Sequence, residues 1–260
     1  MRGVDLSLFQ FDYDLTWAGL FLNADGTVYG RYGSRTGGKK GAEALISVAG
    51  LRKALGRALD HHAAYPANRE AFRGKRAPGP KWRTPEQMPA LDGKFDRPGD
   101  ASCIHCHHAY SGWRRSLALE KSALPDSLIW TYPLPENVGV RLDVDEGNAV
   151  AAVLPGSIAE KAGVRAGDVL VSVDGQPILS PADVQWALHA ADRARLTVEI
   201  RREGAGRSLA LDLEGPWRRG DLSWRESMWD ARPGLWLVEL TAEERAKAGL
   251  AAGVLGLRVK

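Results

Sequence analysis

Closely spaced glycines divide the middle of this 260-residue chain into short apolar runs, and that spacing constrains the fold most. Pro155-Gly156-Ser157 can cap a helix over Ile158 to Ala162, and Gly163 then closes it. The run Val164 to Gly175 reads as a turn, a buried strand and a second tight turn at Asp174-Gly175. The pattern therefore predicts a small unit of short strands with a one-turn helix between them.

The flanking residues complete this unit. Val138 to Leu142 and Ala149 to Leu154 read as short strands before the first helix. Ser180 can cap a second helix over Pro181 to Ala191, with proline at its first position and Asp183 at its third. A final hairpin, Arg195 to Arg202 and Ser208 to Leu213, is predicted to turn through Gly204-Ala205-Gly206 and close a small barrel.

In these residues, above all in "PGSIAEKAGVRAGDVLVSVDGQPI", the chain resembles the PDZ domains of HtrA-type bacterial proteases. The resemblance covers residues 136–214 and implies that a peptide or a protein C-terminus adds as a strand beside the second helix. The implied peptide-binding residues are Asn137, Val138, Gly139, Val140, Leu142, Val184 and Leu188. A bulky residue at Gly139 is expected to abolish binding without unfolding the domain. The alternative is that this groove is an internal docking surface without a free ligand.

No protease machinery accompanies the PDZ pattern. The chain has no Gly-x-Ser-x-Gly motif and no familiar arrangement of His and Asp around a serine. No thiol precedes Cys103, so neither a hydrolase site nor a thiol-exchange site is visible.

The two cysteines of the chain lie together in Cys103-Ile104-His105-Cys106-His107. This spacing is typical of c-type haem attachment, in which Cys103 and Cys106 bond the porphyrin and His107 ligates the iron. The same atoms, with His105 and His108, could instead hold zinc. A redox pair is less well supported, because Pro98 to Ser102 precede the motif where a thioredoxin fold has a buried strand.

The sequence does not name a second axial ligand for a haem. Met228 is the sole methionine after the motif, and it lies beyond the PDZ-like residues. His108 would point about 100° away from His107 on a helix. His61, His62 or Met88 remain as candidates, or an open position, although a solvated helix end explains the two histidines more simply.

The residues before the motif carry their own signals. Gly3 to Phe11 reads as a strand, and Asp25-Gly26 predicts a hairpin into a strand over Thr27 to Tyr32. Ser47 can cap a helix that ends near His61-His62. Residues 66–100, rich in proline and glycine, predict a wrapping segment, and a short helix is expected over Ser111 to Lys121.

The stretch "GVDLSLFQFDYDLTWAGLFLNADGTVYGRYGSR", the CIHCH motif and the PDZ pattern together resemble a bacterial family of thioredoxin-like/PDZ proteins, some of them selenoproteins. This resemblance implies an α+β, multidomain chain. Its parts would be the C-terminal half of a thioredoxin-like domain (1–64), a haem-motif segment (65–135), the PDZ barrel with two helices (136–214) and a Trp-rich, truncated second PDZ-like segment (215–260).

Charge and hydropathy exclude two classes of partner. The formal net charge is +3 with acids and bases interspersed, so no nucleic-acid partner is expected. No apolar stretch approaches the roughly 20 residues that span a bilayer. Residues 1–5 lack the apolar core of a signal peptide, so an exported location follows from the haem motif alone.

These observations predict an exported, non-proteolytic, redox-associated protein that carries covalent haem and binds peptides through the PDZ domain, with a redox partner protein. Two alternatives stay open. The first is a haem-free scaffold that binds zinc or peptides, and the second is a truncated thioredoxin-family oxidoreductase.

Overall fold

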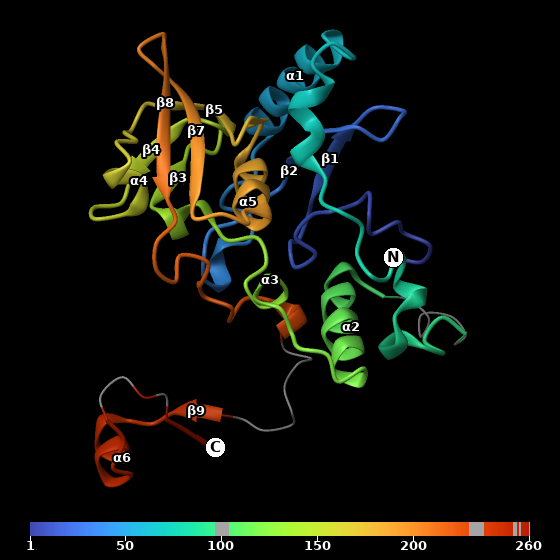
Figure 1. Ribbon diagram of the computed structural model, residues 1–260, viewed down its shortest axis with the longest axis vertical. Coiled ribbons are helices and arrows are strands. Elements are labelled where there is room, and N and C mark those ends of the chain that lie inside the picture. Colours follow the sequence, from blue (N-terminus) through green and yellow to red (C-terminus); the bar gives the residue numbers. More distant parts are fainter. Residues whose placement is uncertain (97–103, 229–236, 252–253, 255, 260) are drawn as a thin grey trace.

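Helix α5 (Pro181–Ala190) lies at the centre of the molecule, between two groups of elements (Figure 1). The computed structural model describes residues 1–96, 104–228, 237–251, 254 and 256–259. The strands of the PDZ-like region lie on one side of α5, and the N-terminal hairpin lies on the other. Within the described residues, every helix is too short or too polar to cross a lipid bilayer.

The PDZ-like region contains the short strands and two helices that the glycine spacing predicts. Strands β3 and β4 pair antiparallel, and four further strands form a sheet in the order β6-β5-β7-β8. The bounds are β3 Val140–Leu142, β4 Val150–Val153, α4 Ile158–Lys161, β5 Val169–Val173, β6 Gln176–Pro177, β7 Arg195–Arg202 and β8 Ala205–Asp212. The side-chain oxygens of Ser157 and Ser180 cap α4 and α5, which confirms both predicted helix starts.

The last hairpin of this region turns one position earlier than the sequence suggested. Strand β8 begins at Ala205, and the turn is formed by Glu203 and Gly204, whose φ angles are +52° and +82°. Two consecutive positive φ angles belong to a two-residue type I′ turn, which matches the twist of the strands it joins. The predicted turn at Gly204-Ala205-Gly206 was therefore wrong, although the hairpin was right.

The N-terminal hairpin and the helix after it are confirmed. Strand β1 (Gly19–Leu22) pairs antiparallel with β2 (Val28–Tyr32) across a turn that contains Gly26 at φ +80°. Helix α1 spans Val48–Ala63, and the backbone N–H of Gly50 donates to Ser47 Oγ at 2.9 Å.

The strand predicted over Gly3 to Phe11 was wrong, because this stretch forms turns. The Asp5 carboxylate accepts hydrogen bonds from the backbone N–H and the hydroxyl of Ser7, at 2.8 and 2.6 Å. The N–H groups of Leu8 and Phe9 then donate to the Asp5 carbonyl. A short acidic side chain that bonds its own backbone in this way competes with extended structure.

The segment between α1 and the PDZ-like region wraps over the molecule through short helical turns, as its proline content predicts. Among the described residues of this segment, the 3-10 helices are Arg69–Lys75, Pro85–Gln87 and Pro89–Leu91. Helix α2 spans Cys106–Leu119, so it starts five residues earlier than Ser111 and includes part of the cysteine motif. Helix α3 (Asp126–Ile129) is a single turn before the PDZ-like region.

Buried apolar side chains form three clusters. One fills the PDZ-like region, between the two sheets and the inner face of α5. The second, called the aromatic cluster below, joins the N-terminus, α2 and α5, and its buried members are Leu6, Tyr13, Trp82, Met88, Ala109, Tyr110, Tyr132 and Trp186. The third, small cluster contains Tyr29, Ala58, Phe72 and Leu179. Trp186 and Leu179 thus belong to cores that lie outside the PDZ-like barrel.

The C-terminal residues include a hairpin and a capped helix. Strands β9 (Leu237–Glu239) and β10 (Leu257–Val259) pair antiparallel, and α6 spans Ala242–Lys247. Of the four tryptophans that begin this region, Trp224 is buried and Trp217 packs on the PDZ core, whereas Trp229 and Trp236 lie outside the described residues. That 215–260 opens a second PDZ-like domain, and that 1–64 is thioredoxin-like, both stay predictions.

Candidate functional site

The loop that precedes β3 is preformed by a 3-10 turn, Pro135–Val138, and by Gly139. Gly139 has φ +92°, its N–H donates to the carbonyl of Glu136, and its carbonyl accepts from the N–H of Leu154. The bond to Leu154 makes Val140 and Val153 a pair without mutual hydrogen bonds in the β3–β4 ladder. The N–H and C=O of Val140 therefore point to the outer edge of β3, whereas those of Arg141 point to β4.

A side chain at position 139 has no room. A Cβ on Gly139 would lie 2.1 Å from Cβ of Ser157, and its φ is one that L side chains rarely adopt. Gly139→Trp would therefore displace Ser157, which caps helix α4. That this variant abolishes binding without unfolding the domain stays a prediction.

The structure gathers the apolar residues predicted to line the groove into one cluster. All five apolar side chains are buried in the PDZ core, namely those of Val138, Val140, Leu142, Val184 and Leu188. Asn137 lies at the surface of the loop, where its amide donates to the carbonyls of Trp217 and Arg219 at 3.0 and 3.1 Å. The loop is thus fastened to the segment that follows β8.

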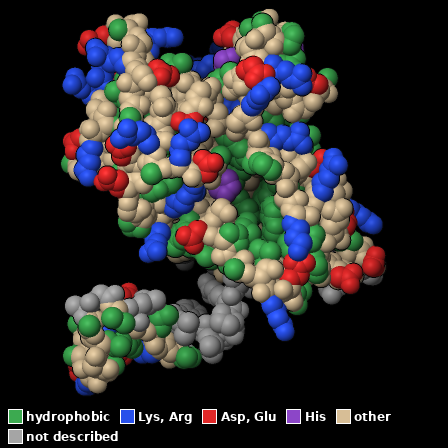
Figure 2. All heavy atoms as spheres, in the orientation of Figure 1, with side chains coloured by type: hydrophobic (Ala, Val, Ile, Leu, Met, Phe, Trp, Pro, Cys, Tyr) green, Lys and Arg blue, Asp and Glu red, His purple; other side chains and the backbone are tan. Residues whose placement is uncertain are grey.

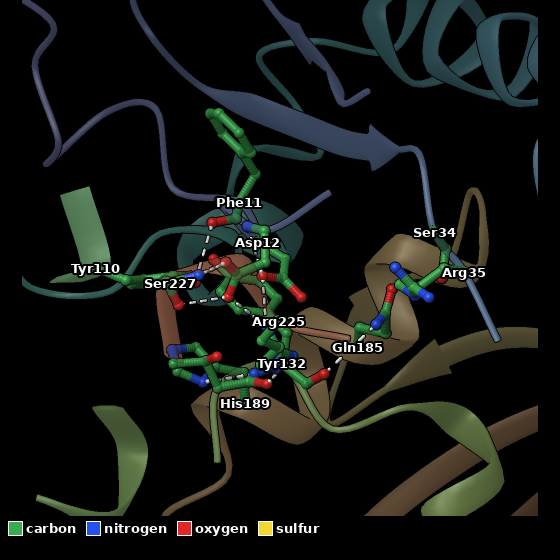
Figure 3. A network of polar contacts seen from close by, with 12 residues as sticks. Phe11, Asp12, Ser34, Arg35, Tyr110, Tyr132, Gln185, His189, Arg225 and Ser227 are labelled. Atoms are coloured by element: carbon green, nitrogen blue, oxygen red, sulfur yellow. Dashed lines mark hydrogen bonds and ion pairs between the residues drawn. The ribbon is translucent and has the colours of Figure 1, made fainter. Parts of the chain in front are cut away.

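Helix α5 is covered on its outer face as well as on its inner one. All residues from Pro181 to Leu188 are buried. The hydroxyl of Ser34, just after β2, donates to the Gln185 amide oxygen at 2.5 Å, and the Gln185 amide nitrogen donates to the carbonyl of Tyr132 (Figure 3). One wall of the predicted groove is therefore in contact with the N-terminal part of the chain.

A buried ion pair fastens the same helix to the wrapping segment. Lys75 Nζ lies 2.6 Å from Asp183 Oδ1, and both side chains are fully buried. The carboxylate of Asp183 also accepts hydrogen bonds from the N–H groups of Arg31 and Leu179, at 3.1 and 3.0 Å. Burial lowers the pKa of Lys75 from 10.5 to about 8, so its ammonium is still charged at neutral pH.

A second buried network joins the N-terminus to the segment after the PDZ-like region (Figure 3). Arg225 contacts Asp12 Oδ1 at 2.8 Å and Asp14 Oδ2 at 3.1 Å, and all three side chains are buried. The Asp14 carboxylate accepts further hydrogen bonds from the backbone and the hydroxyl of Ser227. These contacts link residues more than 200 positions apart and hold residues 225–227 against the N-terminal residues beside the aromatic cluster.

The cysteine motif is described only in part, since Cys103 lies outside the described residues. Cys106 opens α2 and packs against the aromatic cluster. His107 Nε2 lies 3.4 Å from Glu226, and its Nδ1 is buried without a hydrogen-bond partner in the described part of the chain.

The histidines around the motif lie close together. The ring of His107 stacks on that of His105 at 5.7 Å and lies 4.2 Å from that of His108. Among the described residues, which omit Cys103, no group of three or more metal-ligating side chains occurs. The zinc alternative therefore has no assembled site within this part of the chain.

The candidates for a second axial ligand lie in different places. Met88 is buried beside α2, where its sulfur lies 3.1 Å from the position that a Cβ on Gly112 would take. His62 Nδ1 contacts the hydroxyl of Tyr29 at 2.9 Å, and the ring of His61 packs edge-on against Phe72. Both histidines thus contact residues of the small third cluster.

Sequence reasoning missed the residues that cover α5. Asp183 was recognised as a helix-start residue, but nothing in the pattern paired it with Lys75 from a segment rich in glycine and proline. Ser34 and Gln185 carried no signal either, because a serine and a glutamine are ordinary surface residues until a structure brings them together.

The comparisons with known proteins identify the PDZ domain. Residues 149–202 match the family model described as "PDZ domain", so the chain contains one. A DegP-like periplasmic serine endoprotease of Pseudomonas savastanoi pv. phaseolicola is 34% identical over 128 residues, which cover 46% of this chain and 26% of the relative. The periplasmic serine endoprotease DegP of Escherichia coli K12 is 36% identical over 76 residues, covering 29% and 16%.

One solved structure that is similar to part of this chain is a PDZ domain. The HtrA3 PDZ domain bound to the phage-derived ligand FGRWV is 24% identical, with 29% of this chain and 81% of that chain covered and a TM-score of 0.25. This chain spans about a quarter of the first relative and about a sixth of the second. The similarity therefore concerns only a part of either protease.

Proposed function

We propose that this chain is a non-proteolytic peptide-recognition protein whose PDZ domain binds an extended peptide along the outer edge of β3. The outward N–H and C=O of Val140 carry this proposal. An unpaired strand edge beside a preformed loop is the arrangement that strand addition requires. Arg141, exposed on the same strand, would contact the side chains of the peptide.

The contacts of α5 limit how such a peptide would be held. In the usual form of this recognition, side chains of the peptide reach pockets between the strand and the helix. Here Ser34 already contacts Gln185 on α5. We infer that the backbone of β3 supplies most of the affinity, and that the segment Arg31 to Ser34 forms part of the wall.

Hydrogen exchange tests this proposal within one strand. Addition of the peptide Phe-Gly-Arg-Trp-Val at saturation is expected to slow exchange of the Val140 amide by about tenfold or more, since one gained hydrogen bond with burial is worth about 1.4 kcal/mol. The amide of Arg141 already pairs with β4, so it serves as the internal control. Unchanged exchange at Val140, or equal slowing along the outer edge of β8, would contradict binding at β3 and favour the internal docking surface.

Covalent haem attachment is a second candidate, favoured by the surroundings of α2. Cys106 packs among aromatic and apolar side chains, which suit a flat porphyrin, and Nδ1 of His107 is buried with no partner among the described residues. Cys103 and Cys106 would hold the haem and His107 would ligate its iron, giving the chain one-electron chemistry. Attachment in bacteria takes place outside the cytoplasm, so an exported location and a redox partner are part of this proposal.

Expression with a haem-attachment system tests this candidate. Purified wild-type chain is expected to keep its haem absorption after denaturation in acid and acetone, because thioether bonds survive that treatment. Cys103→Ser together with Cys106→Ser should lose all retained haem, and His107→Ala should shift the absorption of the bound haem. His105→Ala is the matched control and should change neither. A haem-free product that contains one zinc ion per chain would reject this candidate and support the zinc scaffold.

A further inference from the structure

A cavity of about 290 Å³ opens between the N-terminal residues, α2, α3 and α5. Six aromatic side chains line it, namely Phe11, Tyr13, Tyr110, Trp113, Tyr132 and Trp186. Figure 2 shows a hollow of hydrophobic side chains at this face of the molecule, with a histidine beside it. Concave, mainly apolar cavities with a few polar groups are typical of small-molecule sites.

The charges of the lining restrict what could bind. None of the described residues that line the cavity is an Asp, Glu, Lys or Arg. The lining histidine, His189, is neutral at physiological pH, because burial and then the nearby Arg218, Arg225 and Arg31 lower its pKa to about 3. A charged ligand would lose its hydration here without touching an opposite charge in the lining.

Two polar groups in the lining are available to orient a ligand. The N–H of Tyr132 donates to His189 Nδ1 at 3.3 Å, which places the ring proton of the neutral imidazole on Nε2. Thr131 lines the cavity and is 2% exposed, yet its hydroxyl oxygen is buried without a partner among the described residues. A buried hydroxyl without a partner is costly unless something bonds to it.

We propose that this cavity binds an uncharged, flat aromatic molecule of about two fused rings that carries one hydrogen-bonding group. An apolar cavity of about 150 Å³ holds benzene, so one of about twice that volume suits a two-ring molecule. The six aromatic side chains pack against the rings of the ligand, and the hydroxyl of Thr131 bonds its polar group. This site is lined by Trp186 and His189 of α5 and by no residue of β3, so it is independent of the peptide-binding proposal.

Titration of the full chain with 2-naphthol, followed by tryptophan fluorescence and calorimetry, tests the site. Saturable binding with one site per chain is expected, with no binding of the anion 2-naphthoate. Thr131→Val keeps the shape and removes the hydroxyl, so it should weaken 2-naphthol roughly 3- to 10-fold, the worth of one neutral hydrogen bond, and leave naphthalene unchanged. Ala77→Phe places a ring in the cavity and should abolish binding of both, whereas the same change at the exposed Ala64 should abolish neither.

Three results would overturn the proposal. The first is that neither 2-naphthol nor naphthalene binds the wild-type chain up to its solubility. The second is that 2-naphthoate binds as tightly as 2-naphthol. The third is that Thr131→Val, with an unchanged melting curve, weakens both ligands alike or neither; this variant decides the matter even if Ala77→Phe does not fold.

Discussion

Replacing Asp183 with alanine is expected to lower the free energy of unfolding by about 3–5 kcal/mol, the usual cost of removing one partner from a buried ion pair. The loss is large because the amine of Lys75 is then fully buried without its carboxylate partner. The N–H groups of Arg31 and Leu179 lose their acceptor at the same time. Urea unfolding of the full chain, followed by circular dichroism, measures the change.

Two further variants separate the ion pair from a general effect of losing a carboxylate. Asp212→Ala is the matched control, because its pair with Arg195 has side-chain exposures of 49% and 68%, so its loss should be far smaller. The double variant Lys75→Met with Asp183→Leu removes both charges and should recover the part of the loss that comes from the unpaired lysine, but not the part from the two N–H groups. A loss for Asp183→Ala no larger than that for Asp212→Ala would mean that α5 is not held by this pair.

Acidification is expected to destabilise the chain through His189. Burial lowers the pKa of this side chain from 6.5 to about 3. Between pH 6.5 and about 3 the imidazole is therefore protonated in the unfolded state and neutral in the folded state. The stabilisation is complete above pH 6.5 and is lost as pH falls toward 3, with a slope of up to about 1.4 kcal/mol per pH unit for one proton. Carboxyl groups of the chain titrate in the same pH range. The contribution of His189 must therefore be measured as the difference in stability between the wild-type chain and a variant that lacks this imidazole.

His189→Asn supplies that difference. Its amide oxygen can still accept the N–H of Tyr132, but it does not titrate. Urea unfolding is measured at several pH values between 7 and 4. The free energy of unfolding of the wild-type chain should exceed that of His189→Asn at neutral pH, and the difference should become smaller as the pH falls. If the difference in the free energy of unfolding stays constant over this range, the pKa of His189 is not lowered in the folded state.

The local structure of the PDZ domain was predictable because short-range chemistry determines it. Ser157 and Ser180 cap their helices, and Asp174-Gly175 forms a tight turn with φ angles of +47° and +73°. Each of these signals depends on residues within four positions of one another, so the sequence displays it directly.

The arrangement around that domain could not be predicted, because it depends on pairs far apart in the chain. Arg225 and Asp12 are separated by 213 positions, and Lys75 and Asp183 by 108. A lysine in a proline-rich stretch is normally predicted to face solvent, but Lys75 is buried. The cysteine motif is an intermediate case, in which its local spacing is informative but its ligand depends on which distant side chains face it.

Helix α5 packs on the PDZ core with one face and on the N-terminal part of the chain with the other, which affects whether the PDZ domain can be moved into another protein. A PDZ cassette cut from the chain at its family boundaries would carry Asp183, Gln185 and Trp186 on a bare surface, because their partners lie in residues 31–75 and at Tyr132. Recombination that moved the cassette alone would expose the buried ring of Trp186 to water. The contacts of α5 therefore make the stability of this domain depend on the N-terminal segment of the chain.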